Sequence, residues 1–151
     1  LNYMNIKSIL FLSLFYLIGW NTQAQSIRVE DRYGKLIAFV DGNLLRSEDR
    51  YGKVLYHFDG EKIREEDRYG SVLFYLDEDH IRLEGPYGLP IFYIDANEIR
   101  KQDKFGKVLY IIDEQKLREK DRYGKSLYHF EGSPQIWVIV CLLYDPLFDE
   151  P

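Results

Sequence analysis

Arginine at one repeated position is the feature of this sequence that most directly suggests binding chemistry. A guanidinium group binds carboxylates and phosphates through paired hydrogen bonds and stacks on aromatic faces. Six arginines that each follow an Ile or a Leu recur every 18 residues: Arg28, Arg46, Arg64, Arg82, Arg100 and Arg118. Arranged in a ring beside aromatic side chains, they would bind an anion or a sugar. The structural interpretation, which we favour, is a ladder in which each arginine stacks on an aromatic ring and pairs with an acid such as Glu48 or Glu66.

The aromatic partners of these arginines depend on the register of the strands. With a three-residue loop, each arginine lies across from one of a second set of residues: Ala38, Tyr56, Phe74, Phe92, Tyr110 or Tyr128. The candidate ligand surface therefore combines the six arginines with Tyr56, Tyr110 and Tyr128. A two-residue Tyr-Gly loop would move each arginine to the other face of the sheet, but it would force the tyrosine to a positive φ.

The remaining residues that could carry chemistry are not clustered. His57 and His129 occupy a repeat position that other units fill with aromatic or aliphatic residues, and His80 stands apart. Metal sites need clustered His, Cys or carboxylates, whereas the carboxylates here are periodic and active sites are usually asymmetric. The sequence contains no nucleophile elbow, phosphate-binding loop, dinucleotide glycine motif or zinc spacing. We therefore expect no enzyme activity, no catalytic residue, no metal and no cofactor.

These residues are positioned by an internal repeat. Asp-Arg-Tyr-Gly begins at Asp31, Asp49, Asp67 and Asp121, and weaker copies begin at Gly85 and Asp103. The step between successive copies is always 18 residues, which marks a repeat architecture. Each unit contains two short segments with strand composition that are separated by turn residues.

The turn residues and the number of units predict the fold class. In Asp49-Arg50-Tyr51-Gly52 the aspartate suits the first position of a type I turn, and the glycine suits a left-handed position in a three-residue loop. The prediction is an all-β domain of about twelve short antiparallel strands in six hairpin repeats. Closure around an axis removes the exposed sheet edges, and the result is a barrel-like ring of hairpins. A single ring would be about 24 Å across, so the hairpins must fold inward as petals or something must plug the middle.

The C-terminal segment, residues 133–151, departs from the repeat. Ser133-Pro134 is a helix-start signal, and residues 136–144 are uninterrupted apolar side chains. We predict a helix over residues 134–144 that covers or plugs the ring, with Trp137 and Leu143 in the core. The β-branched residues of the segment favour the alternative of a thirteenth strand. The single cysteine, Cys141, lies in this segment and is expected to be buried and inert.

The iterated unit Asp-Arg-Tyr-Gly-Lys-x-Leu-Tyr-x-x-Asp-Gly over residues 27–132, together with the N-terminal segment, resembles the bacterial β-flower proteins. These are small exported proteins built from hairpin repeats around an axis, described as four- or five-fold, whereas this chain has six units. The resemblance implies the fold and implies no established activity.

Three segments are expected along the chain. Residues 1–25 have the layout of a secretory signal peptide, with Lys7, an apolar run over residues 9–20 and a cleavage site after Ala24 or Gln25. An uncleaved N-terminal anchor is the alternative. Residues 26–132 form the repeat domain, and residues 133–151 form the apolar tail packed on it. The protein is therefore expected to be exported, to a periplasmic or extracellular location.

The function predicted from these features is an exported, non-catalytic structural or interaction module. The alternative is a multivalent carbohydrate-binding protein that uses the repeated Tyr and Arg positions. Its partner would be a cell-envelope protein or a polysaccharide. A net charge of −5 with interspersed signs argues against nucleic acid, and strands this short argue against a stable membrane span in the mature chain.

Overall fold

The computed structural model describes residues 24–148, so most of the predicted signal peptide lies outside the described residues. These residues form twelve strands, one α-helix and one 3-10 helix. The strands are β1 (Gln25–Val29), β2 (Leu36–Asp41), β3 (Leu44–Ser47), β4 (Val54–Phe58), β5 (Lys62–Glu65), β6 (Val72–Asp77), β7 (His80–Leu83), β8 (Pro90–Asp95), β9 (Glu98–Lys101), β10 (Val108–Asp113), β11 (Lys116–Glu119) and β12 (Ser126–Phe130). The helices are α2 (Ile136–Tyr144) and η1 (Pro146–Phe148).

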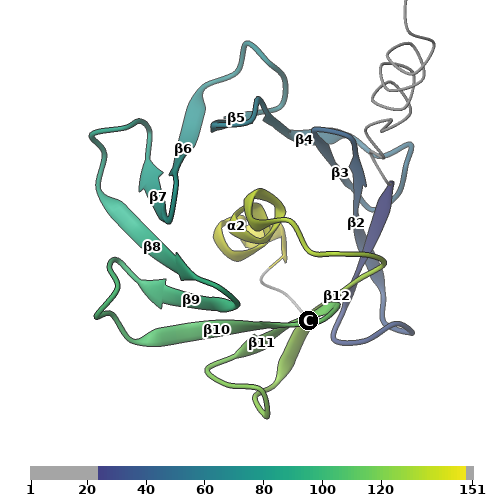
Figure 1. The fold of residues 1–151 in the computed structure, drawn as a ribbon. Helices are drawn as coiled ribbons and strands as arrows, with labels where there is room; N and C mark the ends of the chain where they lie inside the picture. The colour runs from purple at the N-terminus through teal and green to yellow at the C-terminus, as the bar shows by residue number, and fades with distance from the viewer. Residues whose placement is uncertain (1–23, 149–151) are drawn as a thin grey trace, which may run out of the picture.

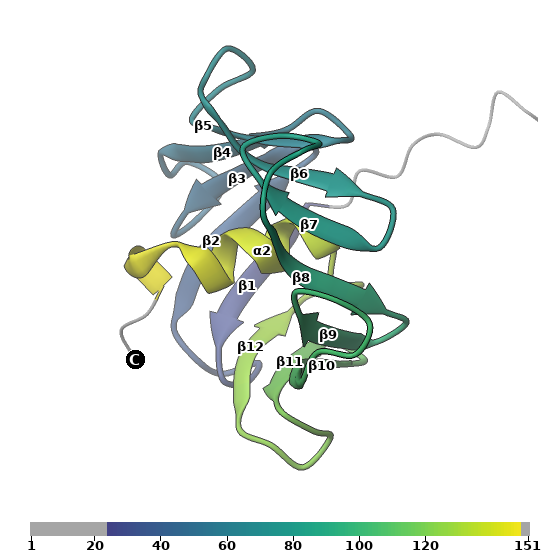
Figure 2. The same ribbon diagram turned by 90° about the vertical axis from the view of Figure 1, so that its left-hand side faces the viewer.

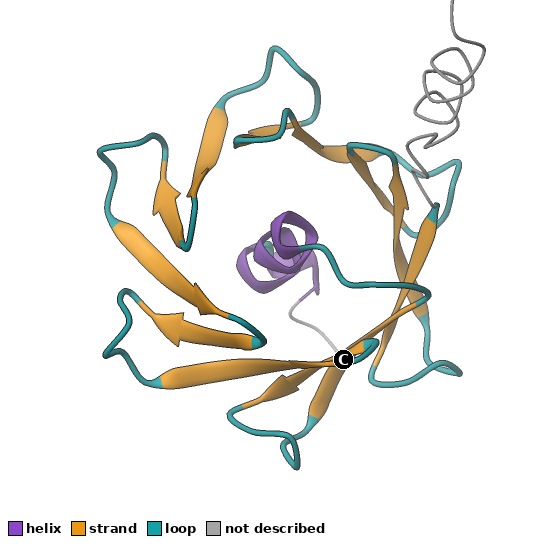
Figure 3. Ribbon diagram, in the orientation of Figure 1, coloured by secondary structure: helices purple, strands orange, loops and turns teal. Residues whose placement is uncertain are grey.

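The twelve strands form one closed antiparallel barrel in which each strand pairs with its neighbours in sequence. The ring closes where β1 pairs with β12, through Ile27 and Phe130, Arg28 and His129, and Val29 and Tyr128. Figure 1 shows the ring with α2 at its centre, and Figure 3 shows that strands form the wall and a helix occupies the middle. The predicted all-β fold of six hairpin repeats closed around an axis is confirmed.

Two kinds of connection alternate around the ring. Loops such as the one that joins β7 to β8 lie at the periphery, and we call the six loops of this kind the outer loops (Figure 1). The short turns, such as the one that joins β8 to β9, lie closer to α2 (Figure 1). Each pair of strands joined by an outer loop therefore forms a petal, and both alternatives suggested by the width of the ring are present, because the petals also surround a plug.

Alternation along the strands decides which residues face the core. We call the six repeated arginines, from Arg28 to Arg118, the ladder arginines. The Ile or Leu before each of them is almost fully buried, at 0–1% exposure: Ile27, Leu45, Ile63, Ile81, Ile99 and Leu117. Successive residues of a strand point to opposite faces, so each arginine faces outward.

The predicted register is wrong at the arginines. Leu45 pairs with Tyr56, and the register then shifts so that Arg46 pairs with Val54. The same irregularity occurs at every outer loop. A bulge inserts an extra residue into one strand, which places the aromatic opposite the Ile or Leu rather than opposite the arginine.

The outer loop uses its aspartate as predicted but its glycine for a different reason. The backbone N–H of Gly52 donates to the carbonyl oxygen of Asp49 at 3.0 Å, and Tyr51 N–H donates to Asp49 Oδ1 at 2.8 Å. The left-handed residue is Glu48, with φ of 60°, and not Gly52. Glycine is required because a Cβ at position 52 would lie 1.6 Å from the carbonyl oxygen of Ser47.

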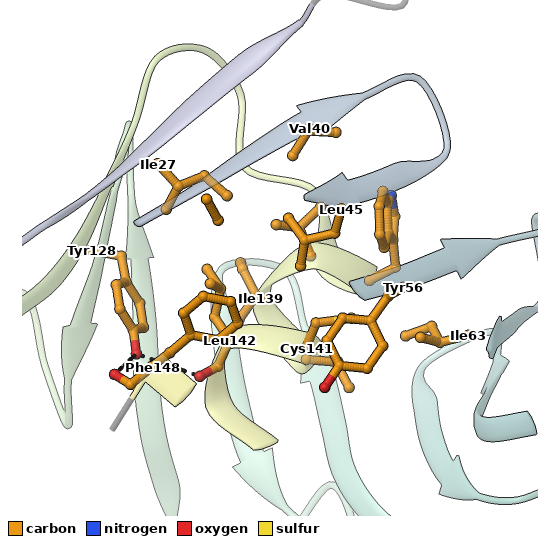
Figure 4. Packing of buried hydrophobic residues seen from close by; sticks show 14 of the residues in the cluster. Ile27, Val40, Leu45, Tyr56, Ile63, Tyr128, Ile139, Cys141, Leu142 and Phe148 are labelled. Atoms are coloured by element: carbon orange, nitrogen blue, oxygen red, sulfur yellow. Dashed lines mark hydrogen bonds between the residues drawn. The ribbon is translucent and has the colours of Figure 1, made fainter. Parts of the chain in front are cut away.

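The apolar tail is a helix inside the ring, and the alternative of a thirteenth strand is wrong. Six consecutive residues, from Trp137 to Leu142, are buried. Figure 2 shows α2 passing between the strands, and Figure 4 shows side chains of α2 among those of the strands. A strand in this position would leave its backbone groups unpaired, because those of the closed ring already bond to each other. A helix satisfies its own backbone, and this outweighs the β-branched composition.

The predicted start of the helix needs correction. Helix α2 begins at Ile136, and its N-cap residue is Gln135, which makes no side-chain capping hydrogen bond. Ser133 serves the ring instead, because its carbonyl oxygen accepts a hydrogen bond from Gln25 Nε2 at 3.0 Å. Trp137 is buried as predicted and stacks on Phe58 with ring centroids 5.3 Å apart, whereas Leu143 is only partly buried against the core.

The plug should dominate stability. Replacing Ile139, which is fully buried, with alanine should lower the free energy of unfolding by about 2–5 kcal/mol, because it leaves a cavity that the packed ring cannot close. Urea unfolding measures the change. Leu147→Ala is the control, because this side chain is 71% exposed, and it should change stability by no more than about 0.5 kcal/mol. Equal changes in the free energy of unfolding for the two variants would contradict the prediction that the buried side chains of α2 dominate stability.

Candidate functional site

The six ladder arginines each hold the outer loop of their own petal. Nη1 of each arginine donates a hydrogen bond of 3.1–3.4 Å to the carbonyl oxygen of the loop glycine six residues later. The glycines are Gly34, Gly52, Gly70, Gly88, Gly106 and Gly124. The arginine therefore replaces, across the irregular part of the strand pair, the backbone bond that the bulge removes.

Each arginine also faces an acid at the end of the neighbouring strand. The distance from Nε to the carboxylate oxygen is 2.9 Å for Arg118 and Asp113 and between 3.4 and 3.9 Å for the other five. The acids are Glu131, Asp41, Asp59, Asp77, Asp95 and Asp113. The predicted acid Glu66 instead pairs with Lys53 at 2.6 Å. The ladder arginines are thus only 21–29% exposed and are engaged with the fold.

The tyrosines of the predicted ligand surface lie on the inner face. Tyr56 is 7% exposed and donates its hydroxyl hydrogen to Asp145 Oδ2 at 2.7 Å. Tyr128 is also 7% exposed and donates to the carbonyl oxygen of Phe148 at 3.1 Å (Figure 4). Tyr110 is partly buried against the core. The single surface of arginines and tyrosines that we predicted is therefore not formed, because the register places the two sets on opposite faces.

Asp145 is a structural residue that the sequence analysis missed. Its side chain is buried, its Oδ2 accepts from Tyr56 of β4, and its Oδ1 accepts from Leu147 N–H at 2.9 Å. Asp145 lies between α2 and η1, so its hydrogen bond with Tyr56 ties the C-terminal end of the helix to strand β4 of the ring. Burial, and then the Asp145 carboxylate, raise the pKa of the Tyr56 hydroxyl. A lone aspartate directly after an apolar run was the available signal.

Exposed aromatics at the tips of the outer loops are the second feature that the sequence analysis missed. We call these the tip aromatics: Tyr33, Tyr51, Tyr69, Tyr87, Phe105 and Tyr123. They are 78–100% exposed. The loop bonds described above use only the backbone of this position. The aromatic ring itself is exposed at the tip, and its presence in all six units was the available signal.

Cations of the outer loops stack on the tip aromatics. Five basic side chains lie 4.7–5.8 Å from the centroid of the aromatic ring that follows them: Arg32, Arg50, Arg68, Lys104 and Arg122. The stacking predicted for the ladder arginines is thus made by a different set of residues. In the weak copy, Pro86 replaces the cation while Tyr87 remains, so an aromatic persists at the tip even where its stacking partner does not.

The histidines and the cysteine form no centre. His57 Nε2 lies 2.9 Å from Asn43 Nδ2, and the His80 ring lies edge-on to Tyr93 with centroids 5.0 Å apart. Within residues 24–148 no three His, Cys, Asp or Glu side chains are grouped so that they could hold a metal ion. Cys141 is buried, and burial raises the pKa of its thiol well above the usual value. No helix in the described part of the chain has the length and apolarity to cross a membrane.

Two open grooves on the outer side of the ring occupy equivalent repeat positions. One, of about 670 Å³, lies between Asn43 and His57 on one side and Tyr69 on the other. The second, of about 500 Å³, lies between Asp79, Tyr93 and Phe105. Six of the eight residues that line the second groove lie 36 residues, or two units, after a residue that lines the first. A groove between a short turn and a tip aromatic therefore occurs twice on this ring, two units apart.

The family model for 6-fold beta flower proteins matches residues 27–140, which is most of the chain. The chain belongs to this family. The match extends through the repeats into α2 and agrees with the six units counted in the sequence, so the four- or five-fold symmetry associated with β-flower proteins does not apply to this one. Searches of the curated proteins and of the solved structures found no match.

The tie between the plug and the wall of this β-flower can be tested with one atom. Tyr56→Phe removes the hydroxyl and leaves a buried Asp145 oxygen without its donor, so the free energy of unfolding should fall by about 1–3 kcal/mol. Chemical denaturation at neutral pH measures the loss. Tyr144→Phe is the matched control, because Tyr144 is 53% exposed and uses its ring rather than a hydroxyl bond to contact Phe74.

A pH series gives a second readout of the same prediction. The raised pKa means that folded Tyr56 keeps its proton where the unfolded chain loses it, above about pH 10. The stability that protonated Tyr56 contributes is fully present below that pH and is lost as the pH rises. Above about pH 10 the free energy of unfolding of the wild type should therefore fall faster than that of Tyr56→Phe, by about 1.4 kcal/mol per pH unit. Parallel curves for the two proteins would contradict a buried, protonated Tyr56.

Proposed function

We propose that this β-flower is an exported, non-catalytic interaction module that binds its partners through the outer loops. The observation that carries the proposal is the contrast between the two faces of the ring. The inner face is filled by the chain's own α2, whereas each of the six outer loops exposes an aromatic side chain at its tip.

The filled interior favours binding over catalysis. Barrels that act on small molecules usually hold them in the central opening or its mouth, and here the plug and its contacts with Tyr56 and Tyr128 occupy that place. Catalytic sites are usually single and asymmetric, whereas the exposed features of this ring occur once in every unit. Several weak contacts of the same kind can give a high overall affinity when one partner occupies several of them at once.

Export is part of the proposal and rests on the N-terminal residues. The apolar run and the small residues before Gln25 have the order of a cleavable secretory signal. Of the two cleavage positions predicted, the one after Ala24 is compatible with the fold. Gln25 is 3% exposed, pairs with Val40 in the sheet and donates its side-chain amide to Ser133.

Mass spectrometry of the secreted protein should therefore find Gln25, or its cyclised form, as the first residue. Only this product keeps the strand pairing and the bond to Ser133, because cleavage one residue later removes both. A mature chain that begins at Ser26 or beyond would contradict the cleavage position. Retention of residues 1–24 in the exported protein would instead support the anchor alternative.

Replacing all six tip aromatics with serine should release the protein from the cell-envelope fraction of its source organism. The side chains are exposed, so the fold should survive, and cooperative unfolding checks that it does. Sedimentation with isolated envelopes measures retention. The control, Tyr144→Ser with Leu147→Ser, changes two exposed apolar residues outside the outer loops and should be retained like the wild type. Equal retention of both variants, or no retention of the wild type, would contradict the proposal.

A further inference from the structure

We propose that the two outer grooves are subsites for the pyranose rings of a neutral polysaccharide, with Tyr69 and Phe105 as their stacking platforms. This inference rests on the interaction role proposed above and names its ligand class. It places the sugar on the outer side of the petals, and not on the six ladder arginines or the interior tyrosines.

The first groove combines an aromatic wall with polar groups. Tyr69 is 78% exposed at the tip of its loop, with the Arg68 guanidinium 4.7 Å from its ring centroid. Opposite it lie the Asn43 amide and His57, which contact each other at 2.9 Å. The Lys53–Glu66 ion pair also lines the groove. The groove thus places an aromatic ring with one open face beside amide, carboxylate and cationic groups. This arrangement fits a ligand that is apolar on its face and polar around its edge.

The second groove repeats this arrangement two units further along the chain. Phe105 is 86% exposed and takes the place of Tyr69. Tyr93 takes the place of His57 and contacts the His80 ring edge-on. Asp79 takes the place of Asn43 and supplies a carboxylate. The aromatic wall and the polar partners are thus preserved although five of the six equivalent side chains differ between the two grooves.

Pyranose sugars have the chemistry that these grooves offer. The axial C–H groups on one face of the sugar pack on an aromatic ring, while the hydroxyl groups at its edge exchange hydrogen bonds with carboxylates, amides and imidazoles. Cavities of 300–1,000 Å³ are typical of small-ligand sites, and both grooves are within this range.

The charges of the grooves favour a neutral polymer. In the first groove Lys53 and Arg68 balance Glu66 and Asp67. In the second groove Lys104 faces four carboxylates, those of Asp77, Glu78, Asp79 and Asp103. A polyanion would be repelled from the second groove. An extended peptide is also disfavoured, because the closed ring leaves no free strand edge to which it could add.

Two subsites on one ring suit a polymer better than a single sugar. Each groove is open to solvent, so each sugar would be held weakly. A polysaccharide that occupies both can gain 10²–10⁴ in overall affinity, because the second contact becomes intramolecular.

The test is affinity electrophoresis of the protein in gels that contain soluble β-glucan, xylan, galactomannan, α-glucan or polygalacturonate. At least one neutral polymer should retard the wild type. The double variant Tyr69→Ala with Phe105→Ala should weaken that retardation by about tenfold, which is the effect of removing stacking platforms. The matched control is Tyr51→Ala with Tyr123→Ala, two equally exposed tip aromatics that do not line the two grooves, and it should change affinity by less than about twofold.

The outcomes separate this inference from the proposed function. No retardation by any polymer, stronger retardation by polygalacturonate, or equal losses in the two double variants would each overturn the groove assignment. The interaction role would still stand if envelope retention depended on the six tip aromatics, which would point to a protein partner. Loss of both results would overturn the interaction role as well.

Discussion

The structure depends on filling the interior of a ring that is too wide for its own side chains. Closure removes every free edge of the sheet, but it also encloses a space around the axis. The six buried Ile and Leu residues of the repeats line this space without closing it. An element that fills this apolar interior must satisfy its own backbone hydrogen bonds, as a helix does. Helix α2, which follows the last repeat, is that element. The repeats and the tail are therefore one folding unit, although only the repeats are periodic.

The outer face solves a different problem, which is how to hold a bulged loop in each petal. The bulge interrupts the ladder of backbone bonds, and the ladder arginine bridges the gap by binding the loop glycine and the acid of the neighbouring strand. These partly exposed ion pairs contribute little individually. Their effect is on geometry, because each of the six guanidinium groups holds its outer loop against the neighbouring strand. With the loop held by its backbone and by the arginine, the aromatic side chain at the tip stays exposed.

The periodic features of the sequence led to the right architecture, and the local ones did not always lead to the right contacts. A fixed step with turn residues is enough to predict paired strands, and an apolar segment without period is enough to predict a buried plug. The partner of Arg46 was mispredicted because a bulge changes register by one residue without a sequence mark, and Glu48 rather than Gly52 takes the left-handed conformation. Tyr56 and Tyr51 are the same residue type five positions apart, and only the register shows that one is buried and the other exposed.

Closure between β1 and β12 sets the order in which this chain can fold. Ile27 finds its partner Phe130 only after more than a hundred further residues have been made, and the helix that fills the ring comes later still. Each hairpin can form as soon as its own residues emerge, so the petals are local and fast, whereas the ring and its core are non-local and slow. Until the final segment arrives, the growing sheet has two unpaired edges and an uncovered apolar face, which is the state most prone to aggregation. Helix α2 thus acts as a completeness check, because a product that ends before it cannot bury its core.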